Sequence, residues 1–227
     1  MGFIGIVSGL AGAVATAISG FASSIGPALV NVGRVLVANL PKIETGLKIV
    51  SAVVQTISVV LGLINKNDTA EELGAKAVES DKKPEDFRST EEYIHYLRNE
   101  VKLDSQKMDT LKTEDRMAYT TIGSVILAKG IEEKFRVNIP VDFWVEVGKQ
   151  KMNADEAKAY IENFKANGFD EVKLSDYLKG KLPIAELKQV APIIENTLKQ
   201  LQSELTPEQV QSKIMEMKQV SSGIESR

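Results

Sequence analysis

The sequence predicts an all-α protein in three parts: two or three apolar, glycine-rich N-terminal helices, a charged linker, and an α-helical bundle. Three observations support this prediction. Residues 1–33 contain no charged side chain, residues 66–88 carry a charge at about every second position, and residues 89–227 repeat helix caps and amphipathic periods without a strand pair. The expected domains are therefore residues 1–65, 66–88 and 89–227.

The prolines divide the apolar front into helices. The Gly26-Pro27 pair ends a first helix over about residues 3–25, because proline lacks a backbone N–H and restricts the residue before it. A shorter second helix starts at Pro27 and stops at Pro41. A third helix covers about residues 43–65, close to the roughly 20 residues that cross a bilayer.

The first helix carries a stripe of small residues, here called the seam, spaced at alternating steps of four and three. The seam consists of Gly5, Gly9, Gly12, Thr16, Ser19, Ser23 and Gly26. Small residues let helix backbones approach closely, which is how helices associate in lipid. The seam therefore predicts a helix-packing interface between copies of the chain. The alternatives are a buried helix of a soluble bundle and a poorly ordered arm.

The third helix separates an apolar stripe from a narrow polar one. The polar stripe consists of Glu44, Lys48, Ser51, Gln55, Ser58, Gly62 and Asn65. A surface helix of a soluble protein usually has a broad, charged polar face, whereas this line is thin and mostly uncharged. The pattern predicts a helix that faces lipid on most sides, with the polar stripe lining a pore. In a soluble bundle, the same Gln55 would instead form a hydrogen bond that supports stability.

Over residues 3–65, these small-residue and polar stripes resemble the glycine-zipper membrane segments of secreted bacterial effectors and pore-forming toxins. Polyomavirus-like minor capsid proteins and phage ejection proteins also begin with Gly/Ala-rich, membrane-active segments. The resemblance implies a protein that inserts into membranes or packs its N-terminal helices together.

The rest of the chain is marked by helix caps. Residues 66–88 are expected to form a solvated linker with one short helix around Leu73. The cap signals that follow are the Ser89/Glu92 capping box, Asn153 before an acidic turn, Gly168 at a C-cap, Pro183 at a helix start, and Thr206-Pro207-Glu208-Gln209. Pro192 is expected to kink the helix in which it lies.

Two features of the rear section concern its core. The uncharged run from Met117 to Ala128 has 12 residues, too few to cross a bilayer, and is expected to be the central buried helix of the bundle. Trp144 is expected to anchor the core, with a partner-binding aromatic patch as the alternative.

Composition excludes most enzyme chemistry. The chain has no cysteine and a single histidine, His95, so thiolate catalysis, disulfides and multi-histidine metal sites are ruled out, and His95 is expected to be a surface or packing residue. Acidic and basic residues are interleaved, 31 against 28, which argues against a nucleic-acid partner. We expect no catalytic residues, cofactor or metal.

The function expected from these patterns is that of a membrane-inserting bacterial toxin or effector, which permeabilises or depolarises a target membrane through oligomerising N-terminal helices. The alternative is a non-enzymatic structural or interaction protein of a phage particle or injection machine. The expected partners are a lipid membrane, further copies of the chain, and a chaperone, immunity or secretion-machine protein. No basic region precedes the apolar run, so a signal-peptide-independent route to a target membrane is expected.

Overall fold

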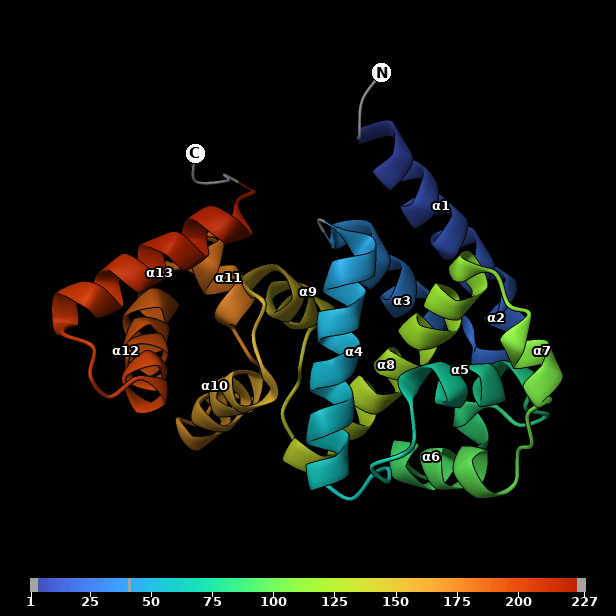
Figure 1. Cartoon of the computed structure of the whole chain (residues 1–227). Coiled ribbons are helices and arrows are strands. Elements are labelled where there is room, and N and C mark those ends of the chain that lie inside the picture. Colours follow the sequence, from blue (N-terminus) through green and yellow to red (C-terminus); the bar gives the residue numbers. More distant parts are fainter. Residues whose placement is uncertain (1–3, 41, 224–227) are drawn as a thin grey trace. The chain divides into compact units, whose positions relative to one another are not determined.

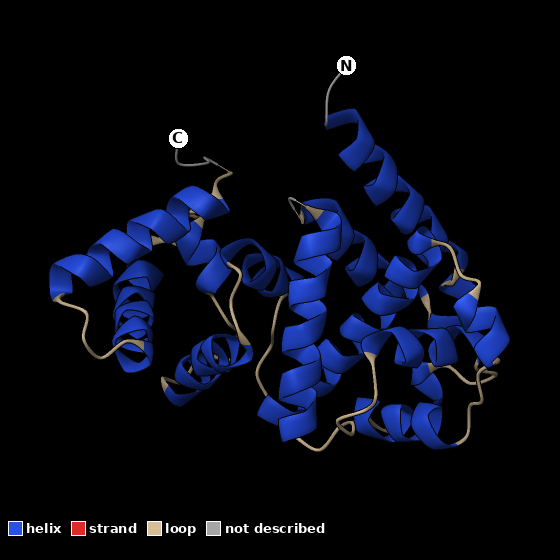
Figure 2. Ribbon diagram, viewed as in Figure 1, coloured by secondary structure: helices blue, strands red, loops and turns tan. Residues whose placement is uncertain are grey.

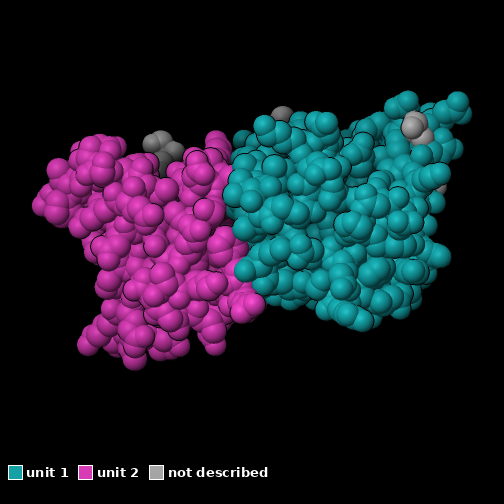
Figure 3. Space-filling model, turned by 90° about the horizontal axis from the view of Figure 1, so that it is seen from below, with its two compact units in different colours: residues 1–134 teal, residues 135–227 magenta. Residues whose placement is uncertain are grey.

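A computed structural model describes residues 4–40 and 42–223. Within these residues the fold is all-α, as the sequence predicts, and no strand forms (Figures 1 and 2). One isolated bridge, between Asn138 and Glu171, pairs two short loops. The chain divides into two compact units, residues 1–134 and 135–227, coloured separately in Figure 3. Each unit is described by itself.

Unit 1 contains the apolar front together with the charged segment and the helix that holds the uncharged run from Met117 to Ala128. Its elements are α1 (Ile4–Gly20), α2 (Ala22–Ile25), α3 (Pro27–Asn39), α4 (Ile43–Val60), α5 (Ala70–Glu79), the 3-10 turn η1 (Pro84–Asp86), α6 (Thr90–Asn99), α7 (Ser105–Asp109) and α8 (Thr113–Phe135). The three predicted front helices are present, but the first is interrupted at Phe21 and the third ends earlier than expected. The predicted stop at Pro41 lies outside the described residues.

Gly62 explains the early end of α4. Its backbone is left-handed, with φ +72°, which suits glycine at the position after a helix. The Leu63 N–H donates to the Ser58 carbonyl at 2.9 Å and the Gly62 N–H donates to the Val59 carbonyl at 3.1 Å, the hydrogen-bond pair of a Schellman motif. Gly62 therefore terminates α4 rather than extending the polar stripe along it.

Helix α8 is buried over most of the Met117–Ala128 run, as predicted, but it lies in unit 1 with the apolar front and not in the separate rear bundle where it was expected. Residues 117–127 are buried except for the partly exposed Thr120. A Cβ added to Gly33 of α3 would lie 3.4 Å from the Thr121 side chain, and the Phe21 ring stacks on Tyr119 with centroids 5.4 Å apart. Helix α8 therefore packs directly against the apolar front.

Helices α5 and α8 approach each other at the level of their backbones. A Cβ added to Gly74 would lie 1.9 Å from the Tyr119 carbonyl oxygen, and one added to Gly123 would lie 1.8 Å from the Ala70 carbonyl oxygen. No side chain fits at either position. The two glycines therefore set the distance between these helices.

Unit 2 is a smaller bundle whose helices begin where local signals place them. Its elements are α9 (Val141–Gln150), α10 (Ala154–Ala166), α11 (Leu174–Leu178), α12 (Ile184–Leu201) and α13 (Pro207–Ser221). The Asn153 and Thr206 side chains close reciprocal capping boxes with Glu156 and Gln209. Helix α12 continues through Pro192 without a break in its helical assignment. In this unit α10 packs on α12, and α13 contacts α9, α11 and α12.

The units do not follow the boundaries expected from the sequence. Residues 66–88 form α5 and η1 inside unit 1, where Leu73 is buried, while Asp81, Lys82 and Lys83 between the two elements are exposed. The chain divides after Lys134 instead. The reason is that α6 and α8 pack together: Thr90 donates both its backbone N–H and its hydroxyl to Glu133, and Lys134 pairs with Glu91 at 2.7 Å.

Candidate functional site

The seam faces away from the rest of unit 1. Helix α1 packs on α3 and α4 through buried residues such as Val14 and Ile18, whereas Gly9, Gly12 and the rest of the seam as far as Ser23 are exposed. A Cβ added to Gly9 or Gly12 would meet no atom within 4 Å. The first turns of α1 extend beyond the other helices of unit 1 (Figure 1).

The hydroxyl groups of the seam are satisfied within α1. Thr16 donates to the Gly12 carbonyl and Ser19 donates to the Ala15 carbonyl, both at 2.8 Å. The exposed face therefore presents no charge and no free hydroxyl donor at these two residues. Gly5 lies in α1, but its surroundings are outside the described residues.

Gly26 does not belong to this open face. It is buried, its φ of +82° separates α2 from α3, and a Cβ there would lie 2.7 Å from the Glu85 carboxylate. The four-and-three spacing extends the seam to Gly26, but helical spacing applies only where the backbone is helical. The left-handed backbone of Gly26 ends the seam at Ser23.

The polar stripe of α4 is used inside the fold. Gln55 accepts a hydrogen bond from the Ala70 N–H at 2.7 Å and donates to the Ser51 carbonyl at 3.1 Å, so it satisfies a free N–H at the start of α5. Ser51 and Ser58 are buried. The middle of the stripe therefore faces the chain's own helices in this state.

The two ends of the stripe lie at the surface. Glu44 and Lys48 form an exposed ion pair at 3.0 Å. Asn65 is exposed beyond the end of α4, where its N–H donates to Asp68 at 2.7 Å. The structure thus separates the seven predicted stripe residues into exposed ends and a buried centre.

One described helix is long and apolar enough to cross a membrane. This helix is Ile43–Val60, and half of that stretch is buried inside the protein. A buried core helix of a soluble protein has the same length and composition. A shorter apolar helix, Gly9–Gly20, includes much of the exposed seam.

The surroundings of His95 and Trp144 agree with the structural roles expected for them. His95 is exposed, and its backbone carbonyl accepts a hydrogen bond from Asn99. Trp144 is buried and meets Phe143 edge to face, with centroids 5.2 Å apart, as expected of a core anchor. Among the residues that the structure describes, no cluster of His, Asp or Glu could hold a metal ion.

Unit 2 contains a buried carboxylate that the sequence did not single out. Glu146 of α9 is 0 % exposed and accepts a hydrogen bond from the Ser221 hydroxyl at 2.9 Å. The Lys179 ammonium lies 3.8 Å from Glu146 and 3.0 Å from Asp142. This network ties α9 to α11 and α13. The available signal was the four-residue spacing of Asp142, Glu146 and Gln150 on α9.

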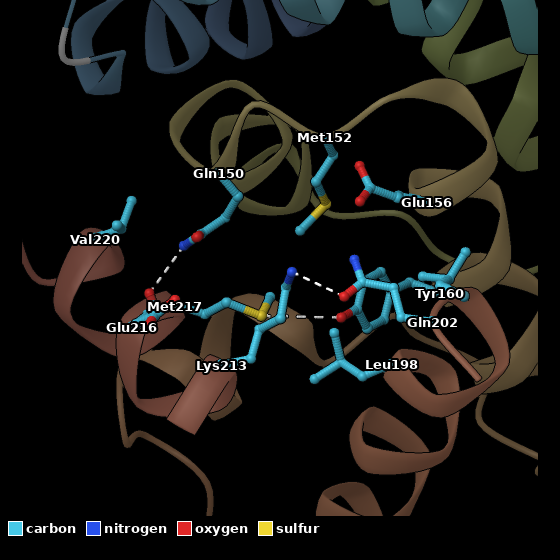
Figure 4. Close-up of a pocket in the computed structure, with 11 residues that line it drawn as sticks. Gln150, Met152, Glu156, Tyr160, Leu198, Gln202, Lys213, Glu216, Met217 and Val220 are labelled. Carbon is cyan, nitrogen blue, oxygen red and sulfur yellow. Dashed lines mark hydrogen bonds between the residues drawn. The ribbon is translucent and has the colours of Figure 1, made fainter. Parts of the chain in front are cut away.

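A pocket of about 210 Å³ opens between α9, α10, α12 and α13. Figure 4 shows its polar groups: Lys213 donates to the Gln202 side chain at 3.1 Å, and the Tyr160 hydroxyl contacts the Met217 sulfur at 4.0 Å. Helical periodicity marks Tyr160 only as a core residue, because nothing local brings α10 and α13 together.

The geometry is therefore that of two structured units, one with an uncharged, small-residue face on α1 and one with a small pocket. Comparisons with family models, curated proteins and solved structures find no match to this chain.

Proposed function

We propose that the protein acts at membranes as an effector whose N-terminal helices are held folded in unit 1 and leave it to insert and oligomerise. The observation that carries this proposal is the exposed face of α1. Glycine costs about 1 kcal/mol relative to alanine in an exposed helix, and apart from the neighbouring backbone of α1 no atom lies within 4 Å of a Cβ at Gly9 or Gly12. A close contact with a helix of another molecule would offset that cost.

The absence of charge on this face points to lipid or to another helix rather than to water. Surface helices of soluble proteins normally carry charged residues on the side away from the core. The apolar faces of α1, α3 and α4 cover one another in the folded unit. Release of these helices would expose enough apolar surface to drive insertion.

Dye release from liposomes tests the proposal. The test compares the wild type with a variant in which an engineered disulfide holds α1 on α3. The chain has no native cysteine, and the Ile18 Cγ2 atom lies 3.5 Å from the position of a Cβ on Gly33, so Ile18→Cys with Gly33→Cys places two sulfur atoms within bonding reach. We expect the wild type to release dye. The oxidised double variant should release dye only after reduction.

Leu40→Cys with Gly46→Cys is the matched control. Leu40 Cβ lies 3.3 Å from the position of a Cβ on Gly46, and this bridge closes only the α3–α4 corner without holding α1. Each pair removes one buried aliphatic side chain, so stability changes in the same direction. Equal release by oxidised and reduced Ile18→Cys/Gly33→Cys protein would show that dye release does not require α1 to leave α3, and would contradict the proposal.

A second candidate function is a structural protein of a particle or injection machine, with α1 packing against other copies. The burial of Ser51 and Ser58 favours it, because the middle of the polar stripe is then not free to line a pore. Gly9→Leu with Gly12→Leu should weaken association, measured by light scattering over a concentration series, while leaving unit 1 folded. Association without any dye release from the wild type would select this candidate and reject the membrane effector.

A further inference from the structure

Hydrogen-bond donors converge in the pocket of unit 2 without matching acceptors. The Lys213 ammonium uses one donor on the Gln202 carbonyl oxygen, and no carboxylate of the described residues pairs with it. The Tyr160 hydroxyl is almost fully buried, and its partner is the Met217 sulfur at 4.0 Å, a weak acceptor. Burial raises the pKa of Tyr160, so this group remains a donor at neutral pH. Figure 4 shows the Lys213 and Tyr160 tips turned toward the same part of the pocket.

The rest of the lining next to these donors is apolar. Met152, Leu198 and Met217 are buried beside the pocket, and Leu201 is partly buried at its edge. Methionine side chains adapt readily to the shape of an apolar ligand. The volume of about 210 Å³ is smaller than that of pockets for drug-sized ligands, so it fits a short chain or a single ring.

The two carboxylates at the border limit the charge of a ligand. Glu156 already accepts a hydrogen bond from the Asn153 N–H at 2.8 Å, and Glu216 is exposed to water. Among the described residues, no ion pair joins either carboxylate to Lys213. Both would repel a second negative charge at the far end of a ligand.

We propose that this pocket binds a small monocarboxylate with an apolar body, its carboxylate held by the Lys213 ammonium and the Tyr160 hydroxyl and its body against Met152, Leu198 and Met217. A carboxylate accepts several hydrogen bonds, which matches the two remaining donors of the Lys213 ammonium and the Tyr160 hydroxyl, whose present acceptor, the Met217 sulfur, is weak. The proposal concerns unit 2 alone and does not depend on any membrane activity of unit 1.

Hexanoate is the probe, with the full chain labelled at its methionine methyl groups and observed by NMR. Saturable shifts of the Met152 and Met217 resonances are expected, with Met117 of unit 1 unchanged. Titration to about 10 mM exceeds the dissociation constant of about 1 mM expected for a ligand of this size. Three compounds of the same chain length serve as controls. Hexan-1-ol lacks the carboxylate, hexylamine carries a positive charge instead, and adipate has a second carboxylate. Each should bind at least about tenfold more weakly than hexanoate.

Two substitutions test the donors. Lys213→Gln should weaken hexanoate at least about tenfold, and Tyr160→Phe several-fold, whereas Lys199→Gln on the exposed side of α12 should leave binding unchanged. The methyl spectrum without ligand reports whether each variant is folded. Absence of a saturable shift in the wild type would overturn the proposal. So would equal binding of hexan-1-ol, or hexanoate binding unaffected by Lys213→Gln in a folded variant.

Discussion

Single residues fix how closely the helices of unit 1 approach. Gly74 and Gly123 allow the backbones of α5 and α8 to touch, whereas Gly9 and Gly12 lie against no other helix of the chain. The packing of unit 1 therefore requires glycine at the first two positions but not at the other two. The difference is measurable with the same substitution.

Gly74→Ala should destabilise unit 1 by about 3 kcal/mol or more, because the added Cβ would lie 1.9 Å from the Tyr119 carbonyl oxygen and the backbones must separate. Gly12→Ala is the control. It adds the same methyl group in open space and should raise the free energy of unfolding by up to about 1 kcal/mol. Urea denaturation measures both. A neutral Gly74→Ala variant would mean that the two helices do not touch at their backbones.

Asp81 provides a pH-dependent contact at the surface of unit 1. The Tyr96 hydroxyl donates to Asp81 at 2.6 Å, and this hydrogen bond lowers the pKa of Asp81 below 3.8. A carboxylate with a lowered pKa stabilises the fold above its ordinary pKa, and that contribution disappears as the pH falls through the lowered value. Tyr96→Phe should therefore raise the pKa of Asp81 toward 3.8, as followed by NMR titration of its carboxyl carbon. An unchanged titration would exclude Tyr96 as the cause.

At the scale of elements, the polar stripe of α4 would have different roles in a folded and in an inserted state, so substitutions in it should change stability in the first and conductance in the second. Gln55→Leu removes the acceptor for the Ala70 N–H and should lower stability by about 1–2 kcal/mol, because that N–H at the start of α5 loses its hydrogen bond. Gln55→Glu retains an acceptor at the start of α5 and should cost less. Thermal unfolding measures the difference. If Gln55→Leu unfolds like the wild type, the hydrogen bond from the Ala70 N–H to Gln55 does not contribute to stability.

The same substitutions separate the structural role of the stripe from a pore role. If inserted α4 helices surround water, Gln55→Glu should shift currents in planar bilayers toward cations, because a ring of carboxylates attracts them. Gln55→Leu should reduce conductance without reducing membrane binding. Currents indifferent to both substitutions, or none from the wild type, would remove the pore hypothesis.

Local signals were sufficient to predict individual helices. Asn153 and Thr206 lie within three residues of the N–H groups that they cap, so their roles follow from spacing alone. The approach of Gly74 to Gly123 joins positions about 50 residues apart, and no local pattern encodes it. The seam was predictable as a stripe, but its direction was not, since periodicity does not say which neighbour a face meets.

At the scale of the whole molecule, the apolar front and α8, with its uncharged middle from Met117 to Ala128, belong to one folding unit. The sequence placed a boundary at the charged residues 66–88, because charge density usually marks solvated linkers. Close packing of α5 and α6 on α8 keeps these residues in unit 1 instead. Average hydropathy cannot anticipate this, because α5 buries only its apolar side.

Residues 135–227 expressed alone should form a cooperatively folded helical domain, because α9 to α13 contact one another and share the buried Glu146 network. A fragment of residues 89–227 adds α8 without α3 and α5, so Ile122 and its buried neighbours would be exposed. We expect that longer fragment to associate and to show weak hydrogen-exchange protection in α8. Circular dichroism and hydrogen exchange test both fragments. Strong protection of α8 in the longer fragment would contradict the unit boundary.

The packing of Gly33 against Thr121 and Ile122 also has a consequence for the order of synthesis. Translation proceeds at about 5–20 residues per second, so the apolar front leaves the ribosome roughly 5–20 s before the α8 residues that cover it. During that interval, a nascent chain displays its least charged segment without its natural cover. A membrane, a chaperone or a second nascent chain that meets it then competes with the protein's own central helix.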